Sequence, residues 1–331
     1  MVETNQALDL DPDVIVTYGN LGLIYLALNR TDDASTTMER ARARKLDGEW
    51  LHQVAYEMAF LRNDPAGMER HVSWAIGRPG DEDFLLSVQS DTEAYYGRLE
   101  KARDYSRRAI DSARGAESME AAALWQANAA LREAEFGNGN AVAAEQGIAA
   151  ALALAPGRDV RIHTTLALAR AGDSSRAKAA AERLEKDYAD DTMVKFYWLP
   201  TIYAAITNNN GGHAEEAISV LQAARPYELG LPPQLSVGTL YPVFVRGQAY
   251  LLAHDGDLAI AEFQKVIDHR GIVLNFPLGA LARLGLARAY GVQGDMARAR
   301  SAYQDFFALW KDADPDIPIL KEAKVEYAQL Q

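Results

Sequence analysis

The sequence predicts an all-α protein in which about eight helical hairpins stack into an α-solenoid. A signature of small and bulky residues predicts it, because the same offsets of three, nine, four and three residues recur along the chain. The clearest copies are Gly22, Tyr25, Ala34, Met38 and Ala41, then Gly247, Tyr250, Ala259, Phe263 and Val266, then Ala287, Tyr290, Ala299, Tyr303 and Phe306. Runs of Asn, Asp and Gly separate the helical segments, and strand patterns are nearly missing.

The signature has a physical reason. Small residues at the first and third places allow two helices to approach closely, and bulky residues at the second and fourth places fill the gaps between them. A hairpin of this kind cannot bury its apolar face alone, so it must stack on its neighbours. Because stacking leaves a long concave surface, we expect a scaffold that binds a partner.

Weaker copies fill the rest of the chain, and the small residue that begins the packing face of each second helix sets their register. These residues follow one another at intervals of 33 to 42 positions and are Ala34, Gly67, Ala102, Ala144, Ala177, Ala217, Ala259 and Ala299. The repeat is clearest over residues 13–48 and 240–310, and the repeat region as a whole covers residues 13–331.

Turn residues fall between the two helices of each unit. Examples are Asn63-Asp64-Pro65, Gly172-Asp173, Gly294-Asp295 and a turn over residues 137–140. Residues 230–239 are expected to form one long loop, because Pro232 and Pro233 interrupt any helix there. We expect a C-terminal cap helix over about residues 315–330, started by Asp314 and Asp316.

Two interpretations are open for residues 1–12. Ala7 and Pro12 occupy the late positions of a preceding repeat, so the chain could be a fragment that starts inside that repeat. Alternatively, residues 1–12 form a cap helix for the first complete hairpin.

The chain resembles the tetratricopeptide-repeat family through Leu21-Gly22, Tyr25, Ala34 and Ala41, with Pro12 and Pro156 in register. The resemblance implies a right-handed superhelix. The final third is also similar to the C-terminal repeats of bacterial proteins that begin with a Ser/Thr kinase or a winged-helix regulator. That similarity runs from Leu240-Tyr241-Pro242 through HRGIVLNFPLGALARLGLARAY to WKDADPDIPILKEAK.

Composition excludes several classes of partner and site. The formal charge of −12 argues against nucleic acid or an anionic membrane as the main partner. The absence of cysteine excludes disulfides and thiolate metal sites. No stretch approaches the roughly 20 apolar residues that span a bilayer. The sequence does not determine the cellular compartment. It is cytoplasmic, or extracytoplasmic if a membrane span precedes the repeats in the parent protein.

Catalytic and metal-binding motifs are missing from the sequence, so we expect no enzyme activity, cofactor or metal. His269-Arg270-Gly271 resembles a kinase catalytic loop only superficially, because glycine cannot serve as a base. The alternating acids Asp312, Asp314 and Asp316 are not followed by the glycine and glutamate of a calcium loop. The five tryptophans are expected to be core residues rather than ligand platforms.

In the tetratricopeptide-repeat family, the first helix of each unit lines the concave surface. Projecting the register onto those helices gives the expected groove residues Asn20, Leu23, Tyr56, Phe84, Asp91, Gln126, Glu133, His163, Tyr203, Gln248 and Arg288. Only Asn20 matches the family's clamp for peptide carboxylates. The aromatic members instead favour an apolar or extended peptide segment of a partner protein.

Several hypotheses about the function are open. The leading hypothesis is a non-catalytic protein-interaction or sensory scaffold in a bacterial signalling protein, with a Ser/Thr kinase as the upstream domain. One alternative is a structural module that self-associates through its repeat ends. Another is the sensor domain of a winged-helix transcriptional regulator, and an enzyme with a hidden site is disfavoured.

Overall fold

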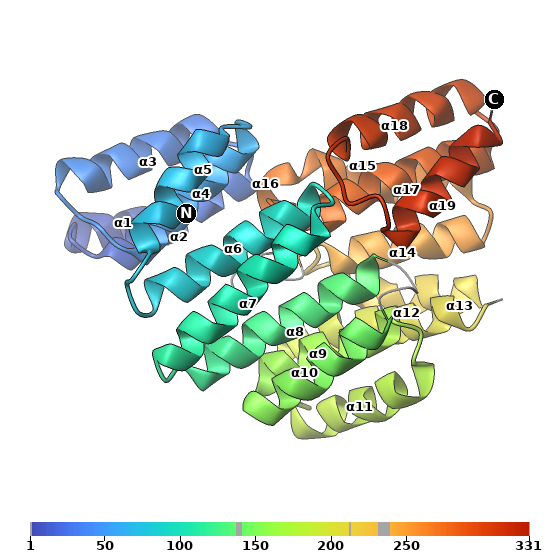
Figure 1. Ribbon diagram of the computed structural model, residues 1–331, viewed down its shortest axis with the longest axis horizontal. Helices are drawn as coiled ribbons and strands as arrows, with labels where there is room; N and C mark the ends of the chain where they lie inside the picture. Colours follow the sequence, from blue (N-terminus) through green and yellow to red (C-terminus); the bar gives the residue numbers. More distant parts are fainter. Residues whose placement is uncertain (1, 137–140, 212, 231–238, 331) are drawn as a thin grey trace.

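The computed structural model describes residues 2–136, 141–211, 213–230 and 239–330, and over these residues the chain is helical with no strand (Figure 1). The predicted turn over residues 137–140 and most of the loop over residues 230–239 lie outside the described residues. The helices are α1 (Val2–Leu10), α2 (Ile15–Ala27), α3 (Thr31–Ala43), α4 (Glu49–Leu61), α5 (Pro65–Ala75), α6 (Asp81–Tyr95), α7 (Leu99–Gly115), α8 (Met119–Glu135), α9 (Ala141–Leu154), α10 (Arg158–Arg170), α11 (Ser174–Asp187), a π-helical turn (Val194–Trp198), α12 (Leu199–Asn209), α13 (Ala214–Val220), a 3₁₀ turn (Leu221–Ala224), α14 (Tyr241–Leu252), α15 (Gly256–Asp268), α16 (Arg270–Val273), α17 (Leu278–Gln293), α18 (Met296–Leu309) and α19 (Pro318–Ala328).

Within the residues that the structure describes, eight hairpins form the stack, as the register predicts. They are α2/α3, α4/α5, α6/α7, α8/α9, α10/α11, α12/α13, α14/α15 and α17/α18. The eight small residues that set the register each lie on the second helix of a hairpin and are buried. The sequence prediction of an all-α solenoid of helical hairpins is therefore confirmed.

The turns inside the hairpins use one chemical device repeatedly. Asn63 and Gly294 adopt positive φ values of 54° and 87°, which end the first helix. An aspartate follows each of them and caps the second helix: Asp64 accepts from the amide of Gly67 at 2.9 Å, and Asp295 accepts from the amide of Arg298 at 2.9 Å. The turn residues read from the sequence thus mark true helix boundaries at these sites.

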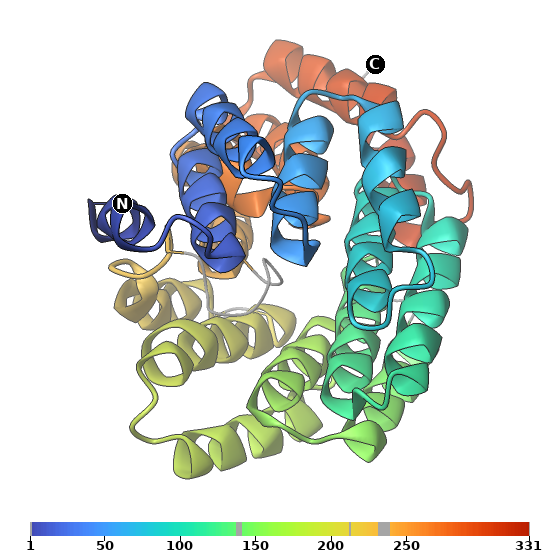
Figure 2. The ribbon, with the colours of Figure 1, turned by 90° about the vertical axis from the view of Figure 1, so that its left-hand side faces the viewer.

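The solenoid winds far enough for its last hairpins to lie beside its first ones (Figure 2). One seam joins α16 to α2 and α4. Asn29 donates to the carbonyl of Asp268 at 3.1 Å, and Arg270 donates to the carbonyl of Leu61 at 2.6 Å. Gly271 packs so closely that a Cβ atom there would fall on the carbonyl oxygen of Leu26. The His-Arg-Gly triplet is therefore a joint between distant repeats.

A second seam joins the segment after α18 to the turn between α6 and α7. The indole of Trp310 donates to the carbonyl of Tyr95 at 2.9 Å, and the amide of Asp314 donates to the carbonyl of Gly97 at 3.0 Å. The carboxylate of Asp314 accepts from the amide of Glu100 at 2.7 Å. The sequence prediction for Asp314 was wrong, because this aspartate caps α7 rather than α19, which starts at Pro318.

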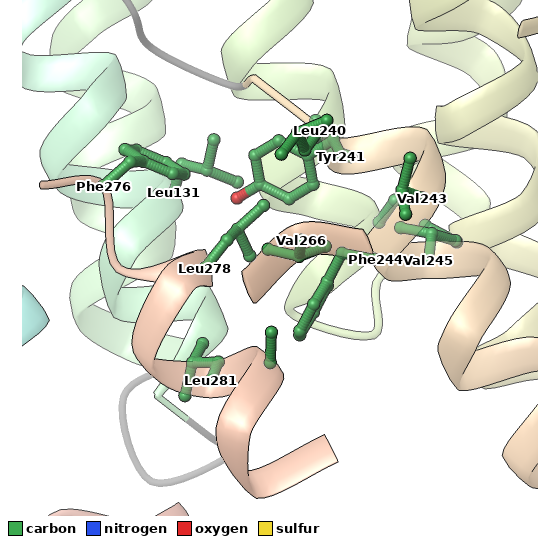
Figure 3. Packing of buried hydrophobic residues seen from close by; sticks show 14 of the residues in the cluster. Leu131, Leu240, Tyr241, Val243, Phe244, Val245, Val266, Phe276, Leu278 and Leu281 are labelled. Atoms are coloured by element: carbon green, nitrogen blue, oxygen red, sulfur yellow. The ribbon is translucent and has the colours of Figure 1, made fainter. Parts of the chain in front are cut away.

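The largest hydrophobic cluster includes residues from the middle of the chain and from its C-terminal third. Tyr241, at the start of α14, packs edge-on against Phe276 with ring centroids 5.8 Å apart, and Leu131 of α8 lies beside them (Figure 3). Trp125, Trp198 and Trp310 are buried as expected, whereas Trp50 and Trp74 are half-buried. The core is therefore shared between hairpins that are far apart in sequence.

The two ends of the chain are helical. At the N-terminus, α1 packs on α2. At the C-terminus, α19 packs on α18, and Glu326 of α19 accepts two bonds of 2.9 Å from Arg288 of α17. In the described residues, the structure contains no helix with the length and apolar character that a membrane crossing requires.

Candidate functional site

Three of the expected groove residues lie in the core. Tyr56 is fully buried, and its hydroxyl donates to Gln89 of α6 at 2.7 Å. Phe84 is 3% exposed and packs against Trp125. His163 is fully buried, with Nδ1 2.8 Å from the carbonyl oxygen of Asp159. None of these three side chains is accessible to a ligand. The sequence prediction that they line an open groove is therefore wrong, because the fold buries them.

Two expected acidic groove residues are engaged in ion pairs. Asp91 of α6 is buried against Arg132 of α8 and accepts from the amide of Asn128 at 3.1 Å. Burial raises the pKa of Asp91, while Arg132 opposes that shift. Glu133 of α8 receives two hydrogen bonds from Arg103 of α7, at 2.6 and 2.8 Å. Both carboxylates therefore connect neighbouring hairpins.

The remaining expected residues are distributed over separate places. Asn20 is exposed on α2, where Leu23 is half-buried. Gln248 accepts from Arg170 at 2.7 Å, and Arg288 is paired with Glu326. Tyr203 is half-buried beside Glu185, and burial raises its pKa to about 12. The structure does not bring these residues together on one surface.

Closure of the solenoid adds further contacts on the first helices. Asn275, between α16 and α17, donates to the carbonyl of Val88 at 2.7 Å and to the hydroxyl of Thr92 at 2.9 Å, so it covers one face of α6. Tyr241 likewise donates to Glu135 of α8 at 3.2 Å. First helices that an open stack would expose are here packed against the C-terminal hairpins.

An open groove lies instead between the second helices α7 and α9, with α8 as its floor. It has a volume of about 470 Å³ and is lined by Arg103, Ser106, Arg107, Ile110, Asp111, Arg114, Gln126, Ala129, Ala130, Glu133, Ala143, Gln146, Gly147 and Ala150. We call this the α7–α9 groove. Two of the expected binding residues, Gln126 and Glu133, lie in it.

Small residues explain why the α7–α9 groove is open. Ala143, Gly147 and Ala150 line it from α9 and recur every three or four positions, so they lie on one face of that helix. A Cβ atom at Gly147 would approach the Cβ of Ala130 to 2.9 Å, which shows how closely α9 meets α8. This stripe of small residues was the sequence signal that could have located the groove.

The polar rim of the α7–α9 groove is mainly cationic. Arg103 is engaged by Glu133, which raises the pKa of Arg103, and Arg107 pairs with Asp104. Arg114 is exposed and makes no ion pair within the described part of the chain. A neighbouring groove of about 250 Å³ between α9 and α11 is lined by Arg161, Arg176 and Arg183, with no acid in its wall. Arginines outnumber acids in both linings, although Arg161 is paired with Asp187 and Arg176 with Glu145 and Asp173 outside the second groove.

Comparison with known proteins gives one family match. The tetratricopeptide-repeat model matches residues 15–41, which span α2 and most of α3. Among solved structures, yeast Tom70 is similar at 12% identity and a TM-score of 0.37, covering 99% of this chain and 84% of that one. The tetratricopeptide-repeat domain of P58(IPK) is similar at 15% identity and a TM-score of 0.29, covering 99% and 92%. No curated protein matches this chain.

Those TM-scores are too low to transfer the arrangement of either structure to this chain. What identifies the architecture is the combination of the matched repeat with the hairpins that continue it. Residues 15–41 are similar to a tetratricopeptide repeat, and the described chain as a whole is an all-α solenoid of eight helical hairpins.

Proposed function

We propose that this chain is a non-catalytic protein-interaction scaffold that holds an acidic, partly apolar segment of a partner protein in the α7–α9 groove. The observation that carries the proposal is the groove itself: a small-residue floor, the half-buried amide of Gln126, and the arginine rim. A helical or extended peptide could place apolar side chains on the floor and carboxylates at the rim. Arginine suits this task because its planar fork binds carboxylates with two hydrogen bonds.

Charge supports the choice of an acidic partner. The α7–α9 groove contains three arginines against two acids, and the neighbouring α9–α11 groove contains three arginines and no acid. An acidic chain with a net charge of −12 repels other acidic proteins at long range, so a local basic groove would orient an acidic segment on approach.

A pair of alanines on α9 provides the experiment. Ala150 lines the groove, whereas its neighbour Ala149 is exposed outside it. Peptides that alternate Glu with Leu would be titrated against wild type, Ala150→Glu and Ala149→Glu by calorimetry. Binding that weakens severalfold in Ala150→Glu and is unchanged in Ala149→Glu is expected. Equal binding by all three proteins would show that the groove is not the site.

The signalling setting is part of the same proposal. Its support is the resemblance of the final third to the C-terminal repeats of bacterial Ser/Thr kinases and winged-helix regulators. A fusion or neighbouring reading frame that encodes such a domain would support this setting, and sequencing upstream of residue 1 tests it.

Self-association is a second candidate, favoured by apolar side chains at the N-terminal end. Leu10 is 87% exposed, and Val14 and Val16 are 39% and 44% exposed. Such residues at the end of a stack can pair with a second copy. Sedimentation of wild type and Leu10→Ser over a range of concentrations tests this, and a monomer at every concentration would exclude it.

A further inference from the structure

A second cleft, distinct from the α7–α9 groove, lies among α3, α4, α5 and the turn that joins α3 to α4. Its volume is about 410 Å³. The polar and aromatic side chains that line it and carry the argument are Arg42, Lys45, Asp47, His52, His71 and Trp74. We call it the histidine cleft.

Hydrogen bonds fix the protonation pattern of the two histidines. His52 Nε2 lies 2.8 Å from Asp47 Oδ1, and His52 Nδ1 lies 2.9 Å from His71 Nδ1. A carboxylate only accepts, so neutral His52 donates from Nε2 and presents a lone pair at Nδ1. His71 must then donate from its own Nδ1. The remaining nitrogen of His71, Nε2, is left as a hydrogen-bond acceptor.

Trp74 holds this chain of hydrogen bonds rigidly. Its ring stacks on His52 with centroids 3.6 Å apart and an interplanar angle of 10°, and its indole donates to Asp47 at 3.1 Å. The guanidinium of Arg78 covers the tryptophan, 4.3 Å from the ring centroid. Neither nitrogen of His52 is therefore free to turn toward a ligand, whereas Nε2 of His71 has no partner among the described residues.

Positive charge surrounds His71 on several sides. Arg42 and Lys45 are exposed and make no ion pair with any described residue. Arg42 on α3 and Arg70 on α5 place positive charge near His71, and Asp64 places a charge of the opposite sign there. Burial and the neighbouring His52, Arg70 and Arg42 lower the pKa of His71 to about 4, so this imidazole is neutral at physiological pH.

We propose that the histidine cleft binds a protonated phosphate group, with Arg42 and Lys45 pairing with its charged oxygens and His71 Nε2 accepting the hydrogen bond of its P–OH. This assignment follows from the combination of two free cations with a fixed acceptor. A fully deprotonated oxyanion would place lone pairs against the lone pair of Nε2. A carboxylate at neutral pH has no proton to give, and a metal cation would meet two positive side chains.

The proposal predicts discrimination between two tetrahedral anions. At pH 6.5 both forms of inorganic phosphate, H2PO4⁻ and HPO4²⁻, carry at least one P–OH, whereas sulfate carries none. Titration of inorganic phosphate into the protein, followed by the NMR signals of the histidine ring protons, is expected to shift His71 saturably. Sulfate is expected to bind at least tenfold more weakly. Phosphate affinity should change little between pH 6.5 and pH 8, because the dianion that replaces the monoanion still carries one P–OH. A phosphomonoester loses its last proton near pH 6, so its affinity should fall as the pH rises above that value.

Variants test the roles separately. Arg42→Gln and His71→Phe are expected to abolish the saturable shift. Because His71→Phe lacks the His71 signal, the ring protons of His52 are observed in that variant. Arg40→Gln is the matched control, because Arg40 is exposed on the same helix but does not line the cleft. Circular dichroism would establish that each variant is folded. A third substitution, His71→Gln, keeps a side chain in this place and should retain weak binding with lost phosphate-over-sulfate discrimination.

Two probes distinguish a phosphorylated protein segment from free phosphate as the natural ligand. The comparison is made at pH 5.5, where most of the phosphate of a phosphoserine peptide still carries a proton. Tighter binding of this peptide than of inorganic phosphate would indicate a phosphorylated protein segment, and equal affinities would indicate free phosphate. Equal response to phosphate and sulfate, or an unchanged response in Arg42→Gln, would overturn the proposal. Its failure would leave the α7–α9 groove untouched, because the two sites share no residue.

Discussion

The carboxylate of Asp314 accepts a hydrogen bond from the backbone amide of Glu100, although 214 residues separate them in the sequence. The bond places an aspartate from the segment after α18 at the first turn of α7. There it satisfies one of the amides that an α-helix leaves without a partner at its N-terminus. The second helix of the third hairpin is therefore capped by a residue near the C-terminal end of the chain.

Asp314→Ala is expected to lower the free energy of unfolding by about 1 kcal/mol, the usual cost of removing a capping side chain. Urea denaturation followed by circular dichroism measures it. Asp312→Ala is the control, because Asp312 is exposed and makes no contact that caps a helix. If both variants lose the same stability, the cap is not responsible.

Gly271→Ala is expected to destabilise the protein by more than about 2 kcal/mol, because the added methyl would overlap the carbonyl of Leu26 and push α16 away from α2. Gly291→Ala serves as the comparison. Gly291 is helical with open space around its Cα, so alanine there should stabilise by up to about 1 kcal/mol. Equal thermal midpoints for the two variants would contradict the close approach at Gly271.

Tyr250→Ala is expected to cost about 3 kcal/mol, because Tyr250 is only 8% exposed between α14 and its neighbours. Tyr290→Ala should cost less, because Tyr290 is half-buried beneath the guanidinium of Arg298, which lies 4.9 Å from its ring centroid. Chemical denaturation distinguishes the two. A larger loss at Tyr290 would show that the two copies of the signature do not differ as their burial implies.

Glu57→Gln is expected to change how stability depends on pH. Burial raises the pKa of Glu57 well above its ordinary value of 4.5, with Asp91 adding to the effect. A carboxyl whose pKa is higher in the folded state stabilises the fold fully below pH 4.5, and this contribution is lost as the pH rises toward the folded-state pKa. Wild type should therefore lose stability from about pH 5 upward.

The glutamine variant lacks this titration, so its stability should fall less over the same range. Asp83 and Glu49 also have raised pKa values, the latter about 7, so a smaller slope is expected to remain. Denaturation midpoints at pH 5, 6, 7 and 8 provide the comparison. Parallel curves for wild type and variant would mean that Glu57 is not kept neutral by the fold.

The helices and their order could be predicted from the sequence because they depend on local spacing. Ala34, Ala259 and Ala299 set the register correctly, since a small residue is needed wherever two helices of one hairpin touch. The turn at Asp64 could be predicted for the same local reason. Each of these features is decided within a few tens of residues.

The placement of the binding surface could not be predicted in this way. Tyr56 and Phe84 occupy positions that would face a groove in an open stack, but Tyr56 is buried against α6 and Phe84 packs on Trp125 of α8, so the adjacent hairpins themselves cover these side chains. No periodicity within a hairpin records how far the superhelix turns. The cap from Asp314 to Glu100 and the covering of Thr92 by Asn275 have the same long-range origin.

The return of α16 to α2 also bears on how the chain reaches its native state. In open repeat arrays each unit contacts only its neighbours, so folding can start anywhere and the ends can fray independently. Here the hydrogen bond from Asn29 to Asp268 links residues 239 positions apart, and it cannot form until the intervening hairpins have folded. Long-range pairing of this kind slows folding and couples the terminal repeats. Hydrogen exchange should therefore show α2 and α15 opening together, as one cooperative unit, although five hairpins lie between theirs along the stack.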